Sequence, residues 1–383
     1  MSDKVDKIYD VLIIGAGASG LFLAANLKAK NVAILEKNPS AGNKILISGG
    51  GRCNITNRHI SEQNYLTDGK FIKKALNAFK FNDVLDFFKN IEFKEQKESQ
   101  FFTKSSSKSV LNTLLQKINA KIFYNTEVIN ASKNGEIFEI LSTKGEKFYA
   151  VNLVVATGGI SYKRLGVSDI GLKIAQNFGL KTINFSPALV GFSVQKSEFW
   201  FKELSGISLN AKMSVGDKIL QGDILFTHKG ISGPCVLNAS LFWQKGTISI
   251  NFLPNFEPKN LTQGKKQLTS VLPLPKRFVL EFLRQNNLQD AAFSEYSNDE
   301  KATILELFNY RFAPAGTFGF NKAEVSKGGV TTAQIDENFQ SKDIKNLYFI
   351  GEVLDVTGML GGYNLHFAFT SAKIVSNALN KVY

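Results

Sequence analysis

The chain has 383 residues, 44% of them hydrophobic and 21% charged, which is enough apolar material for a globular protein of two or three domains. Its charged N-terminus has no apolar signal core and no apolar run is as long as a membrane span, so we expect a cytoplasmic protein with no membrane contact. The two cysteines, Cys53 and Cys235, form no C-x-x-C pair, and only three histidines are present. We therefore expect neither a disulfide scaffold nor a metal site.

The net charge of +13 is the unusual value in this composition. Such a balance is typical of proteins that bind nucleic acid or an anionic surface. Here the lysines are scattered, with short pairs such as Lys73 and Lys74 and no tract of five or more. That dispersal favours a solvated lysine-rich surface, so a nucleic-acid partner is not the leading expectation.

The first pattern with a clear meaning lies near the N-terminus. Residues 11–14 and 32–35 are short apolar runs typical of buried parallel strands, and residues 18–27 supply one apolar helix face. The glycines between the first run and the helix spell G-x-G-x-x-G: Gly15, Gly17 and Gly20. Glu36 follows the second run, sixteen positions after Gly20. This is the dinucleotide-binding fingerprint in its strand, turn, helix and strand context.

Each part of the fingerprint has a separate physical task. Gly15 permits the tight turn, Gly17 lets the backbone approach a pyrophosphate, and Gly20 lets the helix pack on the sheet. Glu36 can accept hydrogen bonds from a ribose diol and would repel a 2′-phosphate, which favours FAD or NAD over NADP. A glycine-rich turn without a ligand is the alternative. The expected cofactor contacts here are Gly15, Gly17, Ala18, Ser19, Gly20, Glu36 and Lys37.

A second glycine-rich segment follows in residues 38–57. Three consecutive glycines leave backbone amides uncovered, and the polar side chains around them can donate hydrogen bonds to a flat polar ligand. The same composition is compatible with a mobile surface loop. Cys53 has no adjacent histidine to activate it, which favours a packed residue over a nucleophile. The expected cofactor contacts here are Lys44, Ser48, Gly49, Gly50, Gly51, Arg52, Cys53 and Asn54.

This loop resembles the signature of a bacterial flavoprotein family, the YhiN and BaiN type, which includes aminoacetone oxidase. Members resemble one another in K-I-L-x-S-G-G-G-R-C-N-x-T-N, and residues 44–57 match that pattern, with Asn43 where arginine or lysine is usual. The resemblance implies a non-covalently bound FAD and an oxidoreductase activity. It also implies that the strand beginning near Val128 contacts adenine through backbone groups.

The middle of the chain alternates helices, strands and an inserted region. We predict helices over residues 71–88 and 107–118, then a small meander with turns at Asn134–Gly135 and Lys144–Gly145. A buried strand over residues 152–156 ends in A-T-G-G, a pattern moderately specific for FAD-binding folds. Its expected cofactor contacts are Ala156, Thr157, Gly158 and Gly159. The loop after it departs from the family pattern S-Y-P-x-T-G-S-T-G-D-G.

Residues 187–254 alternate with a period of two and predict a β-rich insert, in which a helix starts at Pro234. His228 lies in a glycine-containing loop of this insert, where it can either face the flavin or act as a hydrogen-bonded structural residue. Residues 259–311 are predicted to be helical, with Ser297 and Glu300 forming a capping box.

The C-terminal part restores the first fold. A strand over residues 346–350 leads to G-E-V-L-D and G-G-Y-N, then to a helix over residues 364–379. The carboxylate of Glu352 can accept bonds from a ribityl hydroxyl, and the helix N-terminus can point its dipole at the flavin N1/O2 edge. His366 replaces the usual glutamine of the family. The expected contacts are Gly351, Glu352, Asp355, Gly361, Gly362, Tyr363, Asn364 and Leu365.

Together these patterns predict an α/β fold: a Rossmann-like FAD-binding domain of the two-dinucleotide-binding type with an inserted β-rich domain and a small helical subdomain. The expected domains are residues 1–186 with 323–383, residues 187–258 with about 312–322, and residues 259–311.

The predicted function is an FAD-dependent oxidoreductase that transfers a hydride at flavin N5 to or from a small organic substrate. No second fingerprint occurs between residues 156 and 345, so NAD(P)H is expected only as a transient substrate. Oxygen is a further possible electron acceptor, and oxidation of an amine is the competing reaction. Two alternatives remain: a flavin-dependent RNA-modifying enzyme and a flavin-binding sensor without turnover. The candidate catalytic residues are Tyr162, His228, Tyr363 and His366. The oligomeric state is left open.

Overall fold

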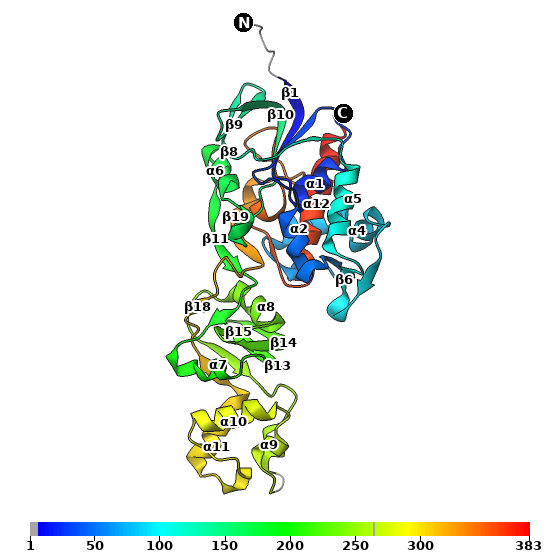
Figure 1. The fold of residues 1–383 in the computed structure, drawn as a ribbon. Coiled ribbons are helices and arrows are strands. Elements are labelled where there is room, and N and C mark those ends of the chain that lie inside the picture. Colours follow the sequence, from blue (N-terminus) through cyan, green and yellow to red (C-terminus); the bar gives the residue numbers. More distant parts are fainter. Residues whose placement is uncertain (1–6, 263–264) are drawn as a thin grey trace. The chain divides into compact units, whose positions relative to one another are not determined.

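The computed structural model describes residues 7–262 and 265–383, and the chain divides into two compact units (Figure 1). Unit 1 contains the residues up to Ser186 and those from Val325 onward, and unit 2 contains the residues from Pro187 to Glu324. The chain thus leaves the first unit once, builds the second, and returns to complete the first.

A mostly parallel sheet forms the centre of unit 1. Its strands are β1 (Ile8–Ile14), β2 (Val32–Leu35), β7 (Lys121–Phe123), β8 (Val128–Asn134), β9 (Ile137–Ser142), β10 (Lys147–Val155) and β20 (Leu347–Phe349). They lie in the order β7, β2, β1, β10, β9, β8, and β20 pairs with the second half of β10. β2, β1, β10 and β20 are parallel, whereas β8, β9 and the first half of β10 form the antiparallel meander predicted from its two glycine turns.

Seven helices and three small sheets complete the described part of unit 1. The helices are α1 (Ala18–Ala24), α2 (Asn43–Ile47), α3 (Gly69–Ala78), α4 (Phe81–Phe87), α5 (Ser107–Lys117), α6 (Ile170–Asn177) and α12 (Tyr363–Leu379). The remaining strands are β3 (Asn54–Asn57), β4 (Tyr65–Leu66), β5 (Phe93–Glu95), β6 (Gln100–Thr103), β11 (Thr182–Ala188), β19 (Val325–Val330) and β21 (Thr357–Gly358). α1 and α12 pack side by side (Figure 1). β3, β6 and β5 form one antiparallel sheet, β4 pairs with β21, and β11 pairs with β19.

The single helix predicted over residues 71–88 is two helices, α3 and α4. Phe79 breaks the run with φ of −152° and ψ of 113°, which turns its ring into the core. Lys80 is also extended, and its N–H donates to the carboxylate of Asp83, which begins the next helix. The apolar periodicity correctly predicts helical structure in this region, but the N-cap of α4 at Lys80 lies within it and separates the two helices.

Unit 2 is an antiparallel sheet with helices. Its strands are β12 (Phe192–Ser193), β13 (Ser208–Val215), β14 (Lys218–Thr227), β15 (Gly230–Ser232), β16 (Ile248–Asn251), β17 (Tyr310–Phe312) and β18 (Gly316–Thr317), and its helices are α7 (Trp200–Glu203), α8 (Pro234–Phe242), α9 (Leu268–Val271), α10 (Lys276–Gln285) and α11 (Asn298–Leu305). The strand order is β17, β16, β13, β14, β15, β12, β18. As predicted, Pro234 opens α8 and the Ser297–Glu300 capping box opens α11.

The helices of residues 259–311 share one apolar cluster with the strands of unit 2. Phe278 of α10 lies 5.7 Å from Phe226 of β14 and 5.0 Å from Phe252, ring centre to ring centre. These contacts join the helices, which the sequence predicts as a small helical subdomain, to the strands of the same unit. Among residues 7–262 and 265–383, no helix is both long and apolar enough to cross a membrane.

Candidate functional site

The turn between β1 and α1 places backbone where side chains would not fit. Gly15 has a φ of 107°, and a Cβ there would lie 2.6 Å from the carbonyl oxygen of Ala156. A Cβ on Gly20 would lie 2.0 Å from the Gly15 oxygen, so this glycine allows α1 to pack on the turn. At Gly17, in contrast, no atom lies within 4 Å of the Cβ position. The backbone at Gly17 thus borders open space at the start of α1, where helix amides are unpaired.

The carboxylate of Glu36 is held in place at the end of β2. One oxygen accepts the Ala16 N–H at 2.8 Å, and the other accepts the backbone N–H of Asn38 at 2.8 Å and its side-chain amide at 2.9 Å. The side chain is 8% exposed. The segment leading to Val128 runs alongside, because the Thr126 N–H donates to the Glu36 carbonyl. The acid is therefore fixed beside the glycine turn, with the predicted adenine-contacting strand next to it.

The three successive glycines form a compact left-handed turn. Gly49, Gly50 and Gly51 have φ of 55°, 65° and 83°. A Cβ on Gly49 would lie 2.8 Å from the Asn54 nitrogen, whereas the Cβ position of Gly50 borders open space. Cys53 follows at a φ of 47° and is fully buried. Burial raises the pKa of its thiol to about 11, against a hydrogen bond with Ser48 that lowers it, so the thiol is neutral and a poor nucleophile.

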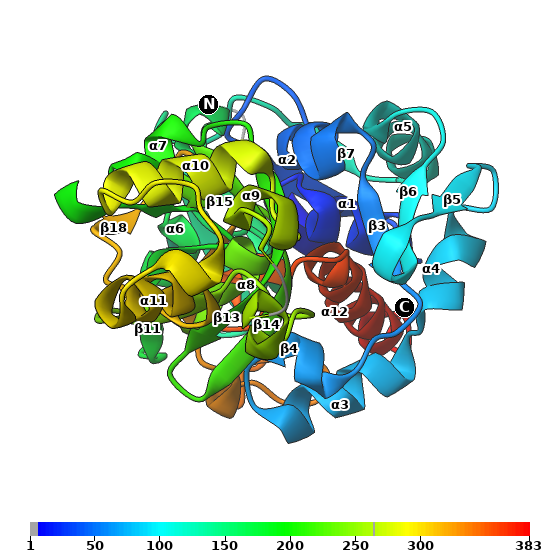
Figure 2. The ribbon, with the colours of Figure 1, turned by 90° about the horizontal axis from the view of Figure 1, so that it is seen from below.

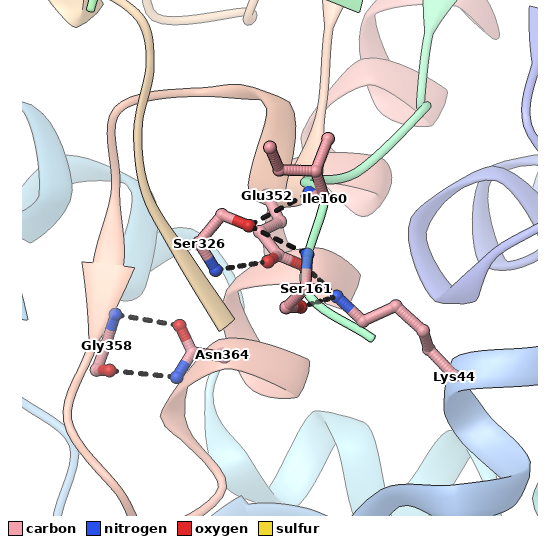
Figure 3. A network of polar contacts seen from close by, with 7 residues as sticks. All are labelled: Lys44, Ile160, Ser161, Ser326, Glu352, Gly358 and Asn364. Atoms are coloured by element: carbon pink, nitrogen blue, oxygen red, sulfur yellow. Dashed lines mark hydrogen bonds and ion pairs between the residues drawn. The ribbon is translucent and has the colours of Figure 1, made fainter. Parts of the chain in front are cut away.

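A polar network joins four segments that are far apart in the sequence (Figure 3). Lys44 Nζ of α2 lies 2.6 Å from Glu352 Oε2 and 2.8 Å from Ser161 Oγ. Glu352 Oε1 accepts the Ser326 N–H at 2.7 Å. The Oγ of Ser326 in turn accepts the N–H groups of Ile160 and Ser161 at 2.9 and 3.1 Å. Glu352 thus has protein partners on both oxygens, and each oxygen keeps a further lone pair for a ligand hydroxyl.

The A-T-G-G turn lies between the first glycine turn and this network. The Ala156 N–H donates to the Ile14 carbonyl, which aligns the end of β10 with the end of β1. A Cβ on Gly159 would lie 2.6 Å from Ser326 Oγ and 2.7 Å from Glu352 Oε1. The hydroxyl of Thr157 is buried and has no hydrogen-bond partner in the described part of the chain.

The start of α12 closes on both glycine-rich segments. A Cβ on Gly351 would lie 2.7 Å from Ser19 Oγ of α1. Gly362 has a φ of 91°, and its Cβ would lie 2.7 Å from Asn54 Oδ1, a buried oxygen without a hydrogen-bond partner among the described residues. The side chain of Asn364 accepts the Gly358 N–H and donates to the Gly358 oxygen, both at 2.8 Å, which fixes the turn before the helix (Figure 3).

Of the candidate catalytic residues, Tyr162 and Tyr363 lie in unit 1 at this site. Tyr162 is half-buried and left-handed, with φ of 56° and ψ of 55°, and it directly follows Ser161 of the polar network. A non-glycine residue with these angles is uncommon and concentrates at functional sites. Tyr363 begins α12 and is buried; its carbonyl accepts the Tyr65 hydroxyl. Burial, and to a lesser extent the charge of Glu98, raises the pKa of Tyr363.

The two histidine candidates lie in different surroundings. His366 is 1% exposed inside α12; its Nδ1 lies 2.9 Å from the Thr56 hydroxyl and its ring stacks on Phe79. Burial lowers the pKa of His366 to about 4, although a hydrogen bond with the Phe79 backbone raises it, so the ring is neutral near pH 7. His228 is exposed in the turn between β14 and β15 of unit 2. Because His228 belongs to unit 2, its role at the flavin stays a prediction.

Two residues of the polar network, Ser161 and Ser326, were not singled out from the sequence, and neither was Lys327, which follows Ser326 in the chain. Burial lowers the pKa of Lys327, against the charge of Asp355, which raises it. Burial raises the pKa of Asp355, against a hydrogen bond from the Gly328 backbone and the charge of Lys327. The sequence signal nearby is the pair Gly328–Gly329 directly after Lys327, which marks an irregular strand but no chemistry.

Comparison with known proteins decides the family. Residues 9–378 match the HI0933-like protein Rossmann domain. The chain belongs to the HI0933-like family. A relative from Haemophilus influenzae, named ribosomal RNA dihydrouridine synthase, is 36% identical over 384 residues and covers 94% of this chain and 96% of its own. A relative from Clostridium scindens, named 3-dehydro-bile acid delta(4,6)-reductase, is 29% identical over 410 residues and covers 96% of this chain and 98% of its own. The resemblance to the YhiN and BaiN type is confirmed.

The fold also resembles that of solved flavoenzymes. The FrdA subunit of Escherichia coli quinol fumarate reductase superposes with a TM-score of 0.51 at 14% identity, covering 98% of this chain and 70% of that one. At that identity the likeness supports the fold only. It confirms the predicted Rossmann-like FAD-binding fold with additional β-rich and helical parts. The family assignment, and not this superposition, supports an FAD-dependent oxidoreductase.

The residues present fit FAD as the family's cofactor. Gly17 and Gly50 border open space, Glu36 is held by hydrogen bonds at the end of β2, and Asn54 Oδ1 and Thr157 Oγ1 are buried polar atoms without partners among the described residues. Buried polar atoms of this kind usually meet a ligand or water. No group of three or more metal-binding side chains occurs within residues 7–262 and 265–383.

Proposed function

We propose that this protein is an FAD-dependent reductase that saturates a carbon–carbon double bond conjugated to a carbonyl group. The proposal rests on the reactions for which two relatives that match nearly the whole chain are named. One is named for making dihydrouridine and the other for reducing a delta(4,6) bile acid. In both named reactions the reduced bond is a C=C whose electrons are drawn toward an oxygen. A cradle fitted to FAD suits this chemistry.

The reaction adds two hydrogens in two forms. A hydride goes to the carbon β to the carbonyl, a proton goes to the α carbon, and the C=C π bond is lost. When bound, FAD supplies the hydride from its reduced ring, having taken two electrons from NAD(P)H as a transient donor. In this proposal Glu36 and the Gly15–Gly20 turn hold the adenosine end and the diphosphate. The Lys44–Glu352 ion pair and the glycine loop, formed by Gly49, Gly50 and Gly51, hold the remaining part of FAD.

We further propose that Tyr162 Oη donates the proton. Tyr162 has left-handed backbone angles and directly follows Ser161 in the chain. Because Ser161 is hydrogen-bonded to both Lys44 and Ser326, the turn that bears the phenol is held in place. General acids need to be positioned before their pKa matters. His366, buried and neutral within α12, is better suited to hold the helix against Thr56 than to supply protons.

The substrate we favour is the uracil base of an RNA. The more similar of the two relatives described above bears the RNA name, and the net charge of +13 favours a polyanion as substrate over a neutral lipid. A small unsaturated ketone is the second candidate, supported by the relative named for bile-acid reduction. It corresponds to the small organic substrate expected from the sequence.

The deciding experiment is an anaerobic assay of the flavin-loaded protein. Reduced nicotinamide should bleach the flavin, and added RNA should restore its colour while gaining two hydrogens on uridine, detected by nucleoside mass spectrometry. Restoration by a 3-oxo steroid but not by RNA would select the second candidate. A flavin that no nicotinamide reduces, or that amines reduce instead, would refute the proposed reaction and leave the sensor or amine-oxidase alternative.

A further inference from the structure

The β5–β6 hairpin of unit 1 carries an aromatic ring between two cations on one face. Phe102 of β6 is paired with Lys94 of β5 on one side and with Asn54 of β3 on the other. Directly paired residues of antiparallel strands project from the same face of a sheet. The Arg52 guanidinium lies 5.5 Å from the centre of the Phe102 ring. Arg52 and Lys94 are exposed and Phe102 is half-buried, so the three side chains form one accessible surface, the hairpin face.

The hairpin face is continuous with the glycine loop of the proposed flavin site. A Cβ on Gly49 would lie 3.0 Å from the Phe102 ring, so ring and loop are in contact. Asn54 donates to Gln100 of the same sheet, while its other side-chain atom, Oδ1, faces Gly362 at the start of α12. Figure 2 shows β3 between α12 and the hairpin of β6 and β5. A chain lying on this face would therefore border the glycine loop.

The surrounding sequence holds most of the protein's positive charge. Residues 28–121 contain 17 lysines and arginines against 8 aspartates and glutamates, a net charge of +9 out of +13. Residues 187–324 contain 15 against 12. The excess of positive charge is therefore concentrated in the segment that contains the glycine loop and the hairpin, although its lysines form no continuous tract.

We propose that the hairpin face, formed by Arg52, Lys94 and Phe102, binds single-stranded RNA next to the flavin. A base stacks on the Arg52–Phe102 pair, and Lys94 contacts a phosphate. Proteins recognise single-stranded RNA by stacking its splayed bases on aromatic rings and guanidinium planes, with cations along the backbone. A uracil must be unstacked before its C=C bond can be reached, and a platform beside the flavin would hold its neighbour. This inference rests on the proposed RNA substrate.

The test measures binding of a fluorescein-labelled, uridine-rich RNA of about 12 nucleotides to the flavin-loaded protein by fluorescence anisotropy at several salt concentrations. Phe102→Leu should weaken binding about tenfold, and Phe102→Tyr, which keeps a stacking ring, should bind like the wild type. Lys94→Ala should reduce the slope of log Kd against log salt by about 0.7, the value for one phosphate contact on a single strand. Lys144→Ala, an exposed lysine in the turn between β9 and β10, is the matched control and should change neither quantity.

Two further readouts separate the possible failures. Flavin absorbance and bleaching by reduced nicotinamide should be unchanged in Lys94→Ala, because Lys94 is exposed on β5 and is not part of the proposed flavin cradle. If the wild type binds and reduces RNA while Phe102→Leu and Lys94→Ala bind it equally well, the hairpin face is refuted and the proposed function stands. If the wild type neither binds nor reduces RNA, the RNA substrate is refuted and this inference with it. Should Phe102→Leu lose flavin, the salt slope of Lys94→Ala decides.

Discussion

The two units differ in their buried polar atoms: the five side-chain atoms of the described residues that are buried without a hydrogen-bond partner, on Asn54, Thr67, Thr157, Thr357 and Thr370, all lie in unit 1. At the glycine turns of unit 1, a single added carbon on Gly15 or Gly159 would meet backbone or a carboxylate within 3 Å. The core of unit 2 holds a cluster of rings around Phe201, which lies 4.6 Å from Trp200 and 5.1 Å from Phe226, centre to centre. The charge differs as well, with 31 basic against 21 acidic residues in unit 1 and 15 against 12 in unit 2.

This difference indicates a division of tasks. Backbone exposed by glycines can accept a large polar cofactor but contributes little apolar burial, whereas interlocked rings contribute stability and leave no room for a ligand. We therefore expect substitutions in unit 2 to change the free energy of unfolding and substitutions at the unit 1 cradle to change flavin content or rate. The predictions below test that separation, beginning with the largest expected effect.

Phe201→Ala should break the ring cluster of unit 2. The side chain is fully buried among five aromatic neighbours, so its removal should lower the free energy of unfolding by about 4 kcal/mol. Urea unfolding measures this. The protein that remains folded should keep its flavin and its rate of reduction, and Ile219→Ala, at a 67% exposed position of β14, should be near neutral. Loss of flavin in folded Phe201→Ala would contradict the separation of tasks.

Glu36→Ala should remove FAD and leave the fold intact. Two charge-assisted hydrogen bonds to the ribose diol are worth about 3 kcal/mol together, which corresponds to roughly 150-fold weaker FAD binding. The flavin-to-protein absorbance ratio after purification, followed by titration with FAD, gives the value. Glu36→Gln, which keeps the shape and one acceptor, should fall between the two. An unchanged dissociation constant in Glu36→Ala would show that the ribose lies elsewhere.

Tyr162→Phe should separate the two halves of the reaction. Reduction of the flavin by nicotinamide needs no proton from the phenol, so its rate should be unchanged. Transfer to the substrate double bond should slow by at least about 100-fold if the hydroxyl is the acid. Stopped-flow absorbance resolves both steps. Equal rates in wild type and variant for the second step would remove Tyr162 from the mechanism, and Tyr363→Phe would then be the next variant to measure.

His366→Gln should flatten the pH dependence of stability. Burial lowers the pKa of His366 to about 4 in the folded protein, below the ordinary value of 6.5. Between these values the unfolded chain binds a proton that the folded chain does not, so stability is fully present above about pH 6.5 and is lost as the pH falls toward 4. From about pH 7.5 to pH 5 this histidine should cost the wild type on the order of 2 kcal/mol. Urea unfolding at both pH values tests it, with exposed His59→Gln as the control; equal slopes in wild type and His366→Gln would contradict the prediction.

The fold could be predicted from the sequence wherever local physics is decisive. The apolar strands around the fingerprint, the glycine turns of the meander, Pro234 and the Ser297–Glu300 cap each set their own element. The division between α3 and α4 could not be predicted, because the burial of the Phe79 ring depends on tertiary packing. The shared core of residues 259–311 and the strands of unit 2 is likewise visible only once Phe278 meets Phe226.

The site divides in the same manner. Glycine motifs can be recognised in a sequence because few other residues tolerate their backbone angles. The residue roles assigned from them stay predictions, as does the choice of catalytic group. Ser161 and Ser326 carry no signal, since a serine has a hydrogen-bonding role only through its partners, and these lie 165 positions apart. The ion pair of Lys44 with Glu352 spans 308 positions and was equally hidden, although each residue had been named separately.

The crowding at Gly159 has a consequence for how this protein can vary. A methyl group there would strike the hydroxyl of Ser326 and the carboxylate of Glu352 at once, so alanine at 159 is inadmissible while serine occupies 326. Removing that hydroxyl by Ser326→Gly relieves only one of the two collisions and frees the N–H groups of Ile160 and Ser161. A side chain at position 159 therefore requires changes at both Ser326 and Glu352.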